Sequence, residues 1–243
     1  MKQKGLLVLL MCMVCFFCGN AALTESEEDE YPIIFEKNGL WGAMDEQGTV
    51  IIPPIYAEIS GFSNGYSRIT DSEGYIGLID DKGTVIAECK YDSVTIPNDG
   101  YFVAAYEDES DNHYSYYYEF FHDDGTPTGW RCDFSWGFHE GYADVSLNGA
   151  EYMMDTEGNL YNLAPYSPAT GQFHEGRLLV RKDNLYGYLD RSLQLVIPCQ
   201  YIWAHEFYDG TAFVETDGGV EKIDRDGNIV DDAIDQENPF KRW

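Results

Sequence analysis

FHEGRLLVRKDNLYGYLDRSLQLVIPCQY, residues 173–201, is a complete copy of a unit that recurs along most of this chain. Leu178 and Val180 alternate with their neighbours in the pattern of a strand that has one face toward a core. A second strand ends at Asp190, and a third apolar run closes on Tyr201. The unit is therefore predicted to form a short antiparallel meander.

The unit repeats with a period of about 35 residues. The Phe-x-x-Gly step recurs at intervals of 35 and 34 residues at Phe138, Phe173 and Phe207, and an earlier copy starts at Phe62. The aspartate that ends the second strand recurs at intervals of 35, 35 and 34 residues, from Asp45 to Asp80, from Asp155 to Asp190 and from Asp190 to Asp224. A fixed period of this size indicates a repeat architecture in which neighbouring units share one core.

Most of these aspartates begin a short turn that closes on glycine, as in residues 45–48 and 224–227. Aspartate can bond to the backbone of its own turn, and glycine tolerates a positive φ, so these segments are predicted to be hairpin turns. The segment from Asp224 also resembles the start of a calcium loop. Its twelfth residue is Asp235 rather than glutamate and no flanking helices are evident, so a structural turn is favoured.

Residues 40–45, LWGAMD, with Gly48 and the run 51–56, resemble the bacterial WG repeat, which is named for its Trp-Gly pair. Residues 75–80 and 186–190 are similar, with another residue before the glycine. Tyr152 and Glu221 replace that glycine in other copies, and Leu193 replaces the glycine of the turn. The resemblance covers about residues 33–230. It implies an extracytoplasmic β-repeat protein, and the family carries no general enzymatic activity.

We therefore expect an all-β domain over residues 33–235, built from about six short meanders, with a divergent, inserted repeat at about 101–136 and a tail at 236–243. The unit is shorter than the roughly 40–45 residues of a WD-type propeller blade, which favours stacking as an open solenoid. A closed, propeller-like ring is the alternative.

Residues 1–21 are predicted to be a secretory signal peptide, because Lys2 and Lys4 precede an uncharged apolar run that ends in small residues. The run is shorter than the roughly 20 residues of a spanning helix, so no stable membrane insertion is expected after cleavage. A secreted or extracytoplasmic location follows. The alternative is a lipid anchor on a leader cysteine (Cys12, Cys15 or Cys18), although none of them follows a small residue.

The chain carries 43 acidic and 15 basic residues, a formal net charge of −28. Such a field repels phosphate backbones and anionic lipid surfaces, so nucleic acid is excluded as a direct partner. The acid is dense in residues 22–32, which are predicted to be a disordered spacer.

Three cysteines follow the leader: Cys89, Cys132 and Cys199. Cys89 and Cys199 each precede a tyrosine by two residues and so occupy the same slot in different units. Slots several units apart lie well beyond the roughly 4.4–6.8 Å between Cα atoms that a disulfide allows. We predict that these two are not paired with one another and that all three are small buried residues.

The segment 101–136 departs from the repeat register and is rich in aromatic residues. Strand alternation places Tyr114, Tyr116 and Tyr118 on one face, with Trp130 and Trp136 nearby. One interpretation is an aromatic platform that binds sugar rings or a peptide. The alternative is that a divergent repeat fills its core with tyrosines, which strands favour.

The pairs His139-Glu140 and His174-Glu175, with His205-Glu206 nearby, offer side chains of the kind that bind zinc. They recur beside the turn glycine at equivalent positions, which tandem copying explains, so no metal or other cofactor is predicted. The sequence lacks a Gly-x-Ser-x-Gly elbow and a phosphate loop, and its carboxylates are too numerous to single out a pair. We expect a non-catalytic binding or scaffold module for a glycan or protein partner. A carboxylate-dependent hydrolase is the alternative.

Overall fold

The structure is a computed structural model, which describes residues 31–107 and 116–231. The predicted signal peptide, most of the acidic spacer, Tyr114 and the tail at 236–243 lie outside the described residues. Within the described part of the chain, no helix has the length and apolar character needed to span a bilayer.

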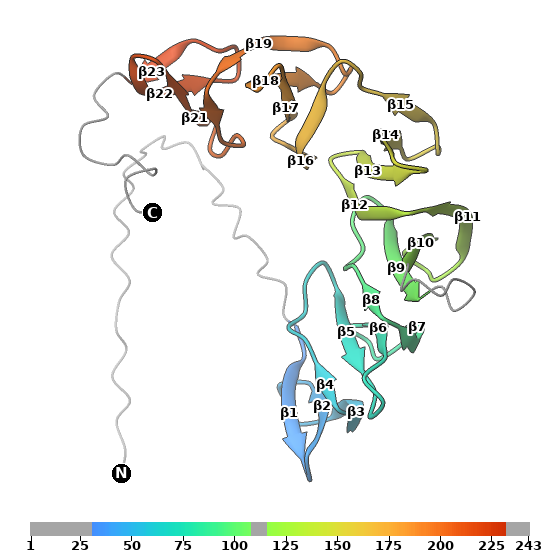
Figure 1. Ribbon diagram of the computed structural model, residues 1–243. Helices are drawn as coiled ribbons and strands as arrows, with labels where there is room; N and C mark the ends of the chain where they lie inside the picture. The colour runs from blue at the N-terminus through green and yellow to red at the C-terminus, as the bar shows by residue number, and fades with distance from the viewer. Residues whose placement is uncertain (1–30, 108–115, 232–243) are drawn as a thin grey trace, which may run out of the picture. The chain divides into compact units, whose positions relative to one another are not determined.

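Six antiparallel sheets, here named A to F, follow one another along the chain (Figure 1). Sheet A has three strands: β1 (Ile33–Lys37), β2 (Leu40–Met44) and β3 (Val50–Tyr56). Sheet B has β4 (Glu58–Ile59), β5 (Tyr66–Thr70), β6 (Ile76–Asp80) and β7 (Val85–Tyr91). Sheet C has β8 (Ser93–Val94), β9 (Tyr101–Glu107), β10 (Tyr116–His122) and β11 (Pro127–Cys132).

The remaining three sheets also have four strands each. Sheet D has β12 (Phe134–His139), β13 (Tyr142–Leu147), β14 (Ala150–Asp155) and β15 (Leu160–Asn162). Sheet E has β16 (Ser167–His174), β17 (Arg177–Lys182), β18 (Leu185–Asp190) and β19 (Leu195–Tyr201). Sheet F has β20 (Trp203–Ala204), β21 (Thr211–Thr216), β22 (Gly219–Asp224) and β23 (Ile229–Asp231). The predicted all-β repeat of short meanders is confirmed.

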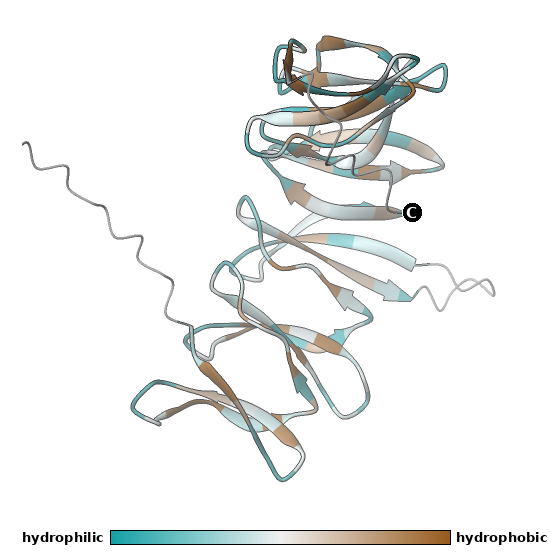
Figure 2. Ribbon diagram, turned by 90° about the vertical axis from the view of Figure 1, so that its left-hand side faces the viewer, coloured by the Kyte–Doolittle hydropathy of each residue, from teal (hydrophilic) through white to brown (hydrophobic). Residues whose placement is uncertain are grey.

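The core consists of five apolar clusters, and each cluster joins two successive sheets. Strand alternation divides the side chains between the clusters. In β6, Leu78 packs toward sheet C, while Ile79 packs toward sheet A. In β18, Tyr188 packs toward sheet F and Leu189 toward sheet D. Figure 2 shows the hydrophobic residues gathered in the strands and the hydrophilic ones at the turns. No sheet could bury its apolar residues without a neighbour, which is why the units stack.

The aspartate turns form as predicted. Asp45 Oδ1 accepts a hydrogen bond from the Thr49 N–H at 2.7 Å, and Asp224 Oδ1 accepts from the Asn228 N–H at 2.8 Å. In both turns the glycine N–H donates to the carbonyl of the aspartate. The segment that resembles a calcium loop is therefore a hairpin turn in the described residues.

The glycine of the WG pair is required by a close approach between strands. Gly42, Gly77 and Gly187 lie where the last strand of sheets A, B and E (β3, β7 and β19) bulges over the strand before it. A Cβ atom on Gly187 would lie 2.6 Å from the carbonyl oxygen of Ile197, and one on Gly77 would lie 2.5 Å from that of Ala87. No larger residue fits without moving the backbone.

The segment 101–136 is more regular than its sequence suggests. β9 and β10 pair over seven successive residues, from Tyr101 opposite His122 to Glu107 opposite Tyr116. The repeat register is lost because this hairpin is longer than the others.

The three cysteines of the described residues are free thiols, but they are not all buried. Cys132 is buried in the cluster between sheets C and D, whereas Cys89 and Cys199 are only half-buried. The prediction of three buried cysteines is therefore wrong for two of them. Both lie in the bulged part of the last strand of their sheet, opposite the glycine, and pack against the edge of a core cluster.

Candidate functional site

Trp136 is the most exposed tryptophan of the described residues, with 60% of its surface accessible. A bulge in β12 between Phe134 and Gly137 turns it outward. Its ring packs edge-on against Phe134, with the ring planes at 90° and the centroids 5.0 Å apart. Phe134 in turn packs against Tyr118 of β10 at 5.2 Å. The three rings therefore form a continuous aromatic row from sheet C to sheet D.

Tyr116 extends this row along the face of β10. It lies two residues before Tyr118 and so on the same side of the strand, as the alternation predicted. Tyr116 is 46% exposed, while Tyr118 packs against the core cluster of sheets C and D. We call Tyr116, Tyr118, Phe134 and Trp136 the Trp136 surface.

Trp130 does not join the Trp136 surface. It packs against Tyr101, Phe120 and Phe138 at centroid distances of 5.7, 6.3 and 6.5 Å. It also lies against the turn glycine Gly158, where an added Cβ would approach the indole within 2.7 Å. Trp130 is therefore half-buried against the core between sheets C and D, as the alternative interpretation of these aromatics describes.

A buried carboxylate fixes the bulge beneath Trp136. Asp144 of β13 is only 7% exposed, and its Oδ1 accepts a hydrogen bond from the Trp136 N–H at 2.8 Å. The Gly137 N–H donates to Ser135 Oγ at 3.0 Å, which satisfies the next backbone group of the bulge. Burial raises the pKa of Asp144 to about 6, although the Trp136 N–H works in the opposite direction.

Asp144 is an exception among the repeats. By strand register its position corresponds to Arg68, Val103, Leu179 and Phe213 in the other four-stranded sheets. Sequence analysis missed Asp144 and Phe134. The available signal was a lone aspartate in an alternating strand, at a slot that is mainly apolar elsewhere.

The paired His-Glu motifs lie closer together than their repeat spacing suggested. The rings of His139 and His174 are 5.3 Å apart, and His139 Nδ1 lies 2.7 Å from the Phe173 carbonyl oxygen. His174 Nε2 is 3.1 Å from Glu206 Oε1. Among residues 31–107 and 116–231, no group of three His, Cys, Asp or Glu side chains is arranged to hold a metal ion.

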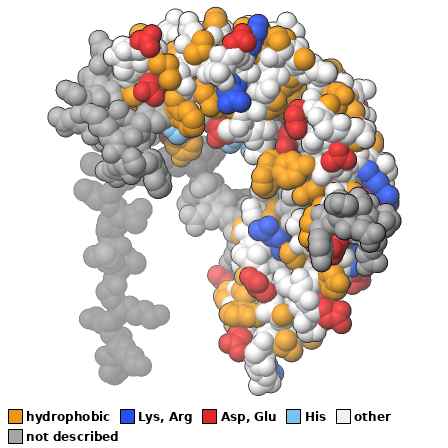
Figure 3. Space-filling model, in the orientation of Figure 1, with side chains coloured by type: hydrophobic (Ala, Val, Ile, Leu, Met, Phe, Trp, Pro, Cys, Tyr) orange, Lys and Arg blue, Asp and Glu red, His pale blue; other side chains and the backbone are white. Residues whose placement is uncertain are grey.

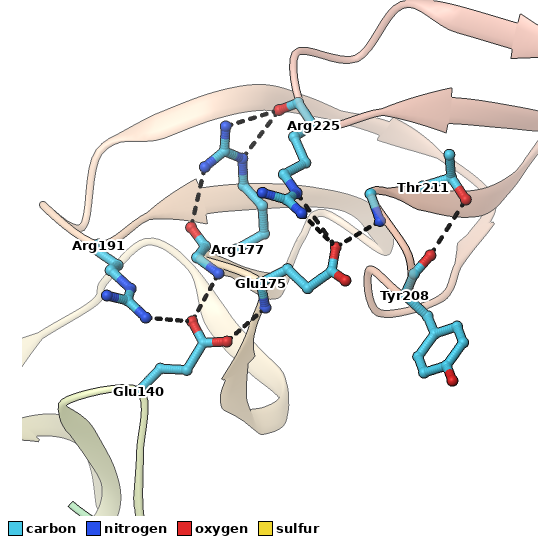
Figure 4. Close-up of polar contacts among 9 residues, drawn as sticks. Glu140, Glu175, Arg177, Arg191, Tyr208, Thr211 and Arg225 are labelled. Carbon is cyan, nitrogen blue, oxygen red and sulfur yellow. Dashed lines mark hydrogen bonds and ion pairs between the residues drawn. The ribbon is translucent and has the colours of Figure 1, made fainter. Parts of the chain in front are cut away.

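The glutamates of these motifs join neighbouring sheets (Figure 4). Glu140, in the first turn of sheet D, accepts hydrogen bonds from the N–H groups of Glu175 and Gly176 at 2.6 and 2.7 Å. It also pairs with Arg191 at 2.8 Å. Glu175 makes the same kind of contact with sheet F, through the Gly210 N–H and Arg225. The motif is thus a structural staple between successive turns.

Acidic side chains are spread over the face shown in Figure 3, with few Lys or Arg side chains among them. The structure therefore defines a class: an acidic, all-β repeat protein with an exposed aromatic surface at Trp136. The WG containing repeat family matches residues 41–73, 76–108 and 186–219. Each match begins one residue before a glycine over which the last strand of the sheet bulges, namely Gly42, Gly77 and Gly187. The chain therefore contains the WG repeat in three segments of its β-sheet domain.

No curated protein sequence matches the chain. Solved structures similar to the chain at low sequence identity include the following three. The BamB protein of Moraxella catarrhalis is 11% identical with a TM-score of 0.38, over 82% of this chain and 69% of BamB. The WD40 β-propeller domain of Doa1 is 10% identical with a TM-score of 0.33, over 77% and 72%. The dihydro-heme d1 dehydrogenase NirN is 13% identical with a TM-score of 0.31, over 83% and 62%.

Proposed function

We propose that this protein is a secreted, non-catalytic binding or scaffold module that contacts a glycan or protein partner through the Trp136 surface. The observation that supports it is a tryptophan turned outward by a bulge whose backbone is held by a buried carboxylate. Large aromatic residues in fixed positions supply most of the binding free energy in many interfaces. A bulge in a strand is a common means of re-aiming one side chain.

The unfavourable burial of the Asp144 carboxylate supports a dedicated role for the bulge. A buried carboxylate is unfavourable unless its hydrogen bonds compensate, and other repeats have an apolar residue or an exposed arginine at this slot. Sheet D therefore contains a buried carboxylate that is locally unfavourable and that holds the backbone of Trp136 in its outward orientation. The net charge of −28 favours a neutral or basic partner over an anionic one.

The test is a binding screen on glycan and protein arrays with the wild type, Trp136→Ala and Tyr116→Ala. We expect a specific ligand whose affinity falls about thirtyfold in Trp136→Ala, because truncation of an aromatic hot-spot residue costs about 2 kcal/mol. Trp203→Ala is the matched control, since Trp203 is also exposed and lies in sheet F. Equal binding by Trp136→Ala and the wild type would exclude this surface.

Secretion is tested by fractionating the cells that make the protein. The proposal expects the protein outside the cytoplasm with its first residue near position 22. A lipid-linked amino terminus at Cys12, Cys15 or Cys18 would support an anchored form instead. Intact residues 1–21 on cytoplasmic protein would rule out both.

The hydrolase alternative draws on one observation, the raised pKa of Asp144, which is typical of a general acid. Its side chain is buried, however, and it already accepts the Trp136 N–H. Hydrolysis of a polysaccharide that is lost in Asp144→Asn, with folding intact, would favour this alternative over the binding module.

A further inference from the structure

An open groove of about 690 Å³ lies between sheets D and E, away from the Trp136 surface. Its walls include Tyr142 of β13, Tyr161 and Asn162 of β15, and Tyr166 in the loop that follows. Leu193 and Gln194, in the aspartate turn of sheet E, form the opposite wall.

The groove exists because β15, the last strand of sheet D, is short. In sheets A, B and E the last strand has seven residues and crosses the glycine of the strand before it. Sheet D has Tyr152 at the glycine position, so the crossing is blocked. β15 pairs with β14 over only three residues, and the chain then leaves the sheet at Leu163.

The neighbouring turn is altered to match. In the sheet A to sheet B contact, the turn glycine Gly83 packs so closely that an added Cβ would lie 2.7 Å from the Ile51 carbonyl oxygen. The corresponding turn of sheet E carries Leu193, whose side chain fits because β15 is short. Leu193 is the only aliphatic residue with positive φ among the described residues, at 59°. An aliphatic side chain in this conformation is strained, and strain of this kind concentrates at functional sites.

The lining is aromatic, aliphatic and polar, and none of the side chains that form it is charged; a nearby cation is Lys182, whose Nζ lies 5.6 Å from the centroid of the Tyr166 ring. The Tyr161 hydroxyl donates to Asp155 Oδ2 at 2.8 Å, and the Tyr142 hydroxyl donates to the Arg191 carbonyl at 2.9 Å. Both rings are therefore held in place, edge to face with centroids 6.2 Å apart. Tyr161 keeps 38% of its surface exposed.

Amide and hydroxyl groups complete the lining. Asn162 Oδ1 accepts a hydrogen bond from the Ala164 N–H at 2.8 Å, which fixes the side chain and leaves its amide hydrogens available as donors. Gln194 and Ser192 lie on the opposite wall. Fixed tyrosine rings with neutral donors and acceptors suit a ring that has an apolar face and hydroxyls at its edge. The absence of charge within so acidic a chain disfavours an ionic ligand.

We propose that this groove is a second binding site, specific for a neutral sugar residue of an oligosaccharide. Tyr161 supplies the apolar face on which the sugar ring lies. Asn162 and Gln194 bind its hydroxyl groups. The site is independent of the Trp136 surface, which lies at the other side of sheet D.

The test uses the full chain and a set of uncharged oligosaccharides (glucose, xylose and N-acetylglucosamine tetramers), measured by isothermal titration calorimetry. We expect saturable 1:1 binding of at least one tetramer. Tyr161→Ala should weaken it about tenfold, equivalent to about 1.4 kcal/mol, in line with the loss of a packed aromatic ring. Tyr208→Ala, which removes another exposed tyrosine in the sheet F turn, should bind like the wild type.

Leu193→Gly is a second variant that protects the test from a folding defect. It installs the residue found at the equivalent turns, so its unfolding midpoint should stay near the wild-type value. It also removes one wall of the groove, and we expect severalfold weaker binding. The proposal is overturned if no neutral tetramer binds at millimolar concentration. It is also overturned if a tetramer binds Tyr161→Ala and Leu193→Gly as tightly as the wild type. Neither outcome bears on binding at Trp136.

Discussion

Sheets D and E have the same strand order and the same aspartate turn, yet they differ in the last strand. β19 of sheet E has seven residues and crosses Gly187, while β15 of sheet D has three and ends at Asn162. Sheet D has Tyr152 where sheet E has Gly187, so a side chain occupies the place where the last strand would cross.

The consequence extends to the next sheet. Where the last strand of a sheet has its full length, the aspartate turn of the next sheet needs a glycine to pack against that strand, as Gly83 does beside Ile51. Where it is short, the following turn can carry Leu193. The two departures from the repeat are therefore coupled across the D–E interface. Apparent degeneracy in a repeat can mark the place where the structure has opened a site.

The largest expected effect comes from forcing sheet E to resemble sheet D. In Gly187→Ala the new Cβ would lie 2.6 Å from the Ile197 carbonyl oxygen and 2.7 Å from the Cys199 N. We expect the free energy of unfolding to fall by about 3 kcal/mol, at the upper end for overpacking against rigid backbone. Urea unfolding measures it.

Gly61→Ala is the control for that substitution. Gly61 has no atom within 4 Å of an added Cβ and no positive φ, so its change in stability should stay within about 0.5 kcal/mol. If the two variants were equally stable, close approach would not be the reason for the glycine, and the account of β15 would fail with it.

The sequence carried enough information for the repeat, because alternation and turn chemistry are local. The period of about 35 residues, the turns at Asp45 and Asp224 and the all-β class were predicted correctly from residues close together in the chain. The short meander also followed, since neither turn depends on distant contacts.

The candidate sites were only partly predictable. Tyr116 and Trp136 were selected and are exposed, while Trp130 belongs to the core because Phe138 of the next sheet covers it. Whether an aromatic side chain of this segment is exposed or covered depends on packing between sheets, and the alternation of residues along one strand does not predict that packing. Tyr152 and Leu193 were noted as departures, but the groove they form requires knowledge of which turn faces which strand.

A smaller effect tests the buried carboxylate that distinguishes sheet D. The pKa of Asp144 is raised to about 6 by burial, so the folded state holds its proton more tightly than the unfolded chain. Stability from this group is full below about pH 4 and is lost as pH rises through about 6. Asp144→Asn lacks the charge, so its free energy of unfolding should exceed that of the wild type by about 2 kcal/mol at pH 7. This is somewhat less than the free energy that corresponds to the whole pKa shift.

The difference between Asp144→Asn and the wild type should shrink toward zero as pH falls to about 4. Asp190 provides the contrast in sheet E. Its pKa is lowered by the Ser192 hydroxyl and by backbone donors of the turn, so its contribution is lost at acid pH instead. Thermal melting across pH 2–8 should place Asp144→Asn above the wild type and Asp190→Asn below it at pH 7. The first difference should vanish between about pH 6 and pH 4, and the second only below the ordinary carboxyl pKa of 3.8. Parallel trends would mean that Asp144 is not stabilised in its neutral form.

The smallest effect concerns what the two sheets share. Glu140 of sheet D and Glu175 of sheet E both accept backbone N–H groups of the next turn and pair with an arginine. Burial alone would raise the pKa of Glu140, but Arg191 and the N–H groups outweigh it and keep the pKa below its usual value. Because these side chains are partly exposed, water replaces much of the lost contact. We expect Glu140→Ala and Glu175→Ala each to lose about 1 kcal/mol.

Amide exchange distinguishes a staple from a surface charge in this last case. The Gly176 N–H should exchange faster in Glu140→Ala and the Gly210 N–H faster in Glu175→Ala, while the other amide stays protected in each variant. Glu73→Ala is the control. Glu73 contributes its backbone N–H to its turn, as a donor to Asp71 Oδ1, and the substitution leaves that N–H in place. Unchanged exchange at Gly176 would mean that only the apolar cluster holds sheet D to sheet E. Because β15 is short, that interface would then be weaker than the one between sheets E and F.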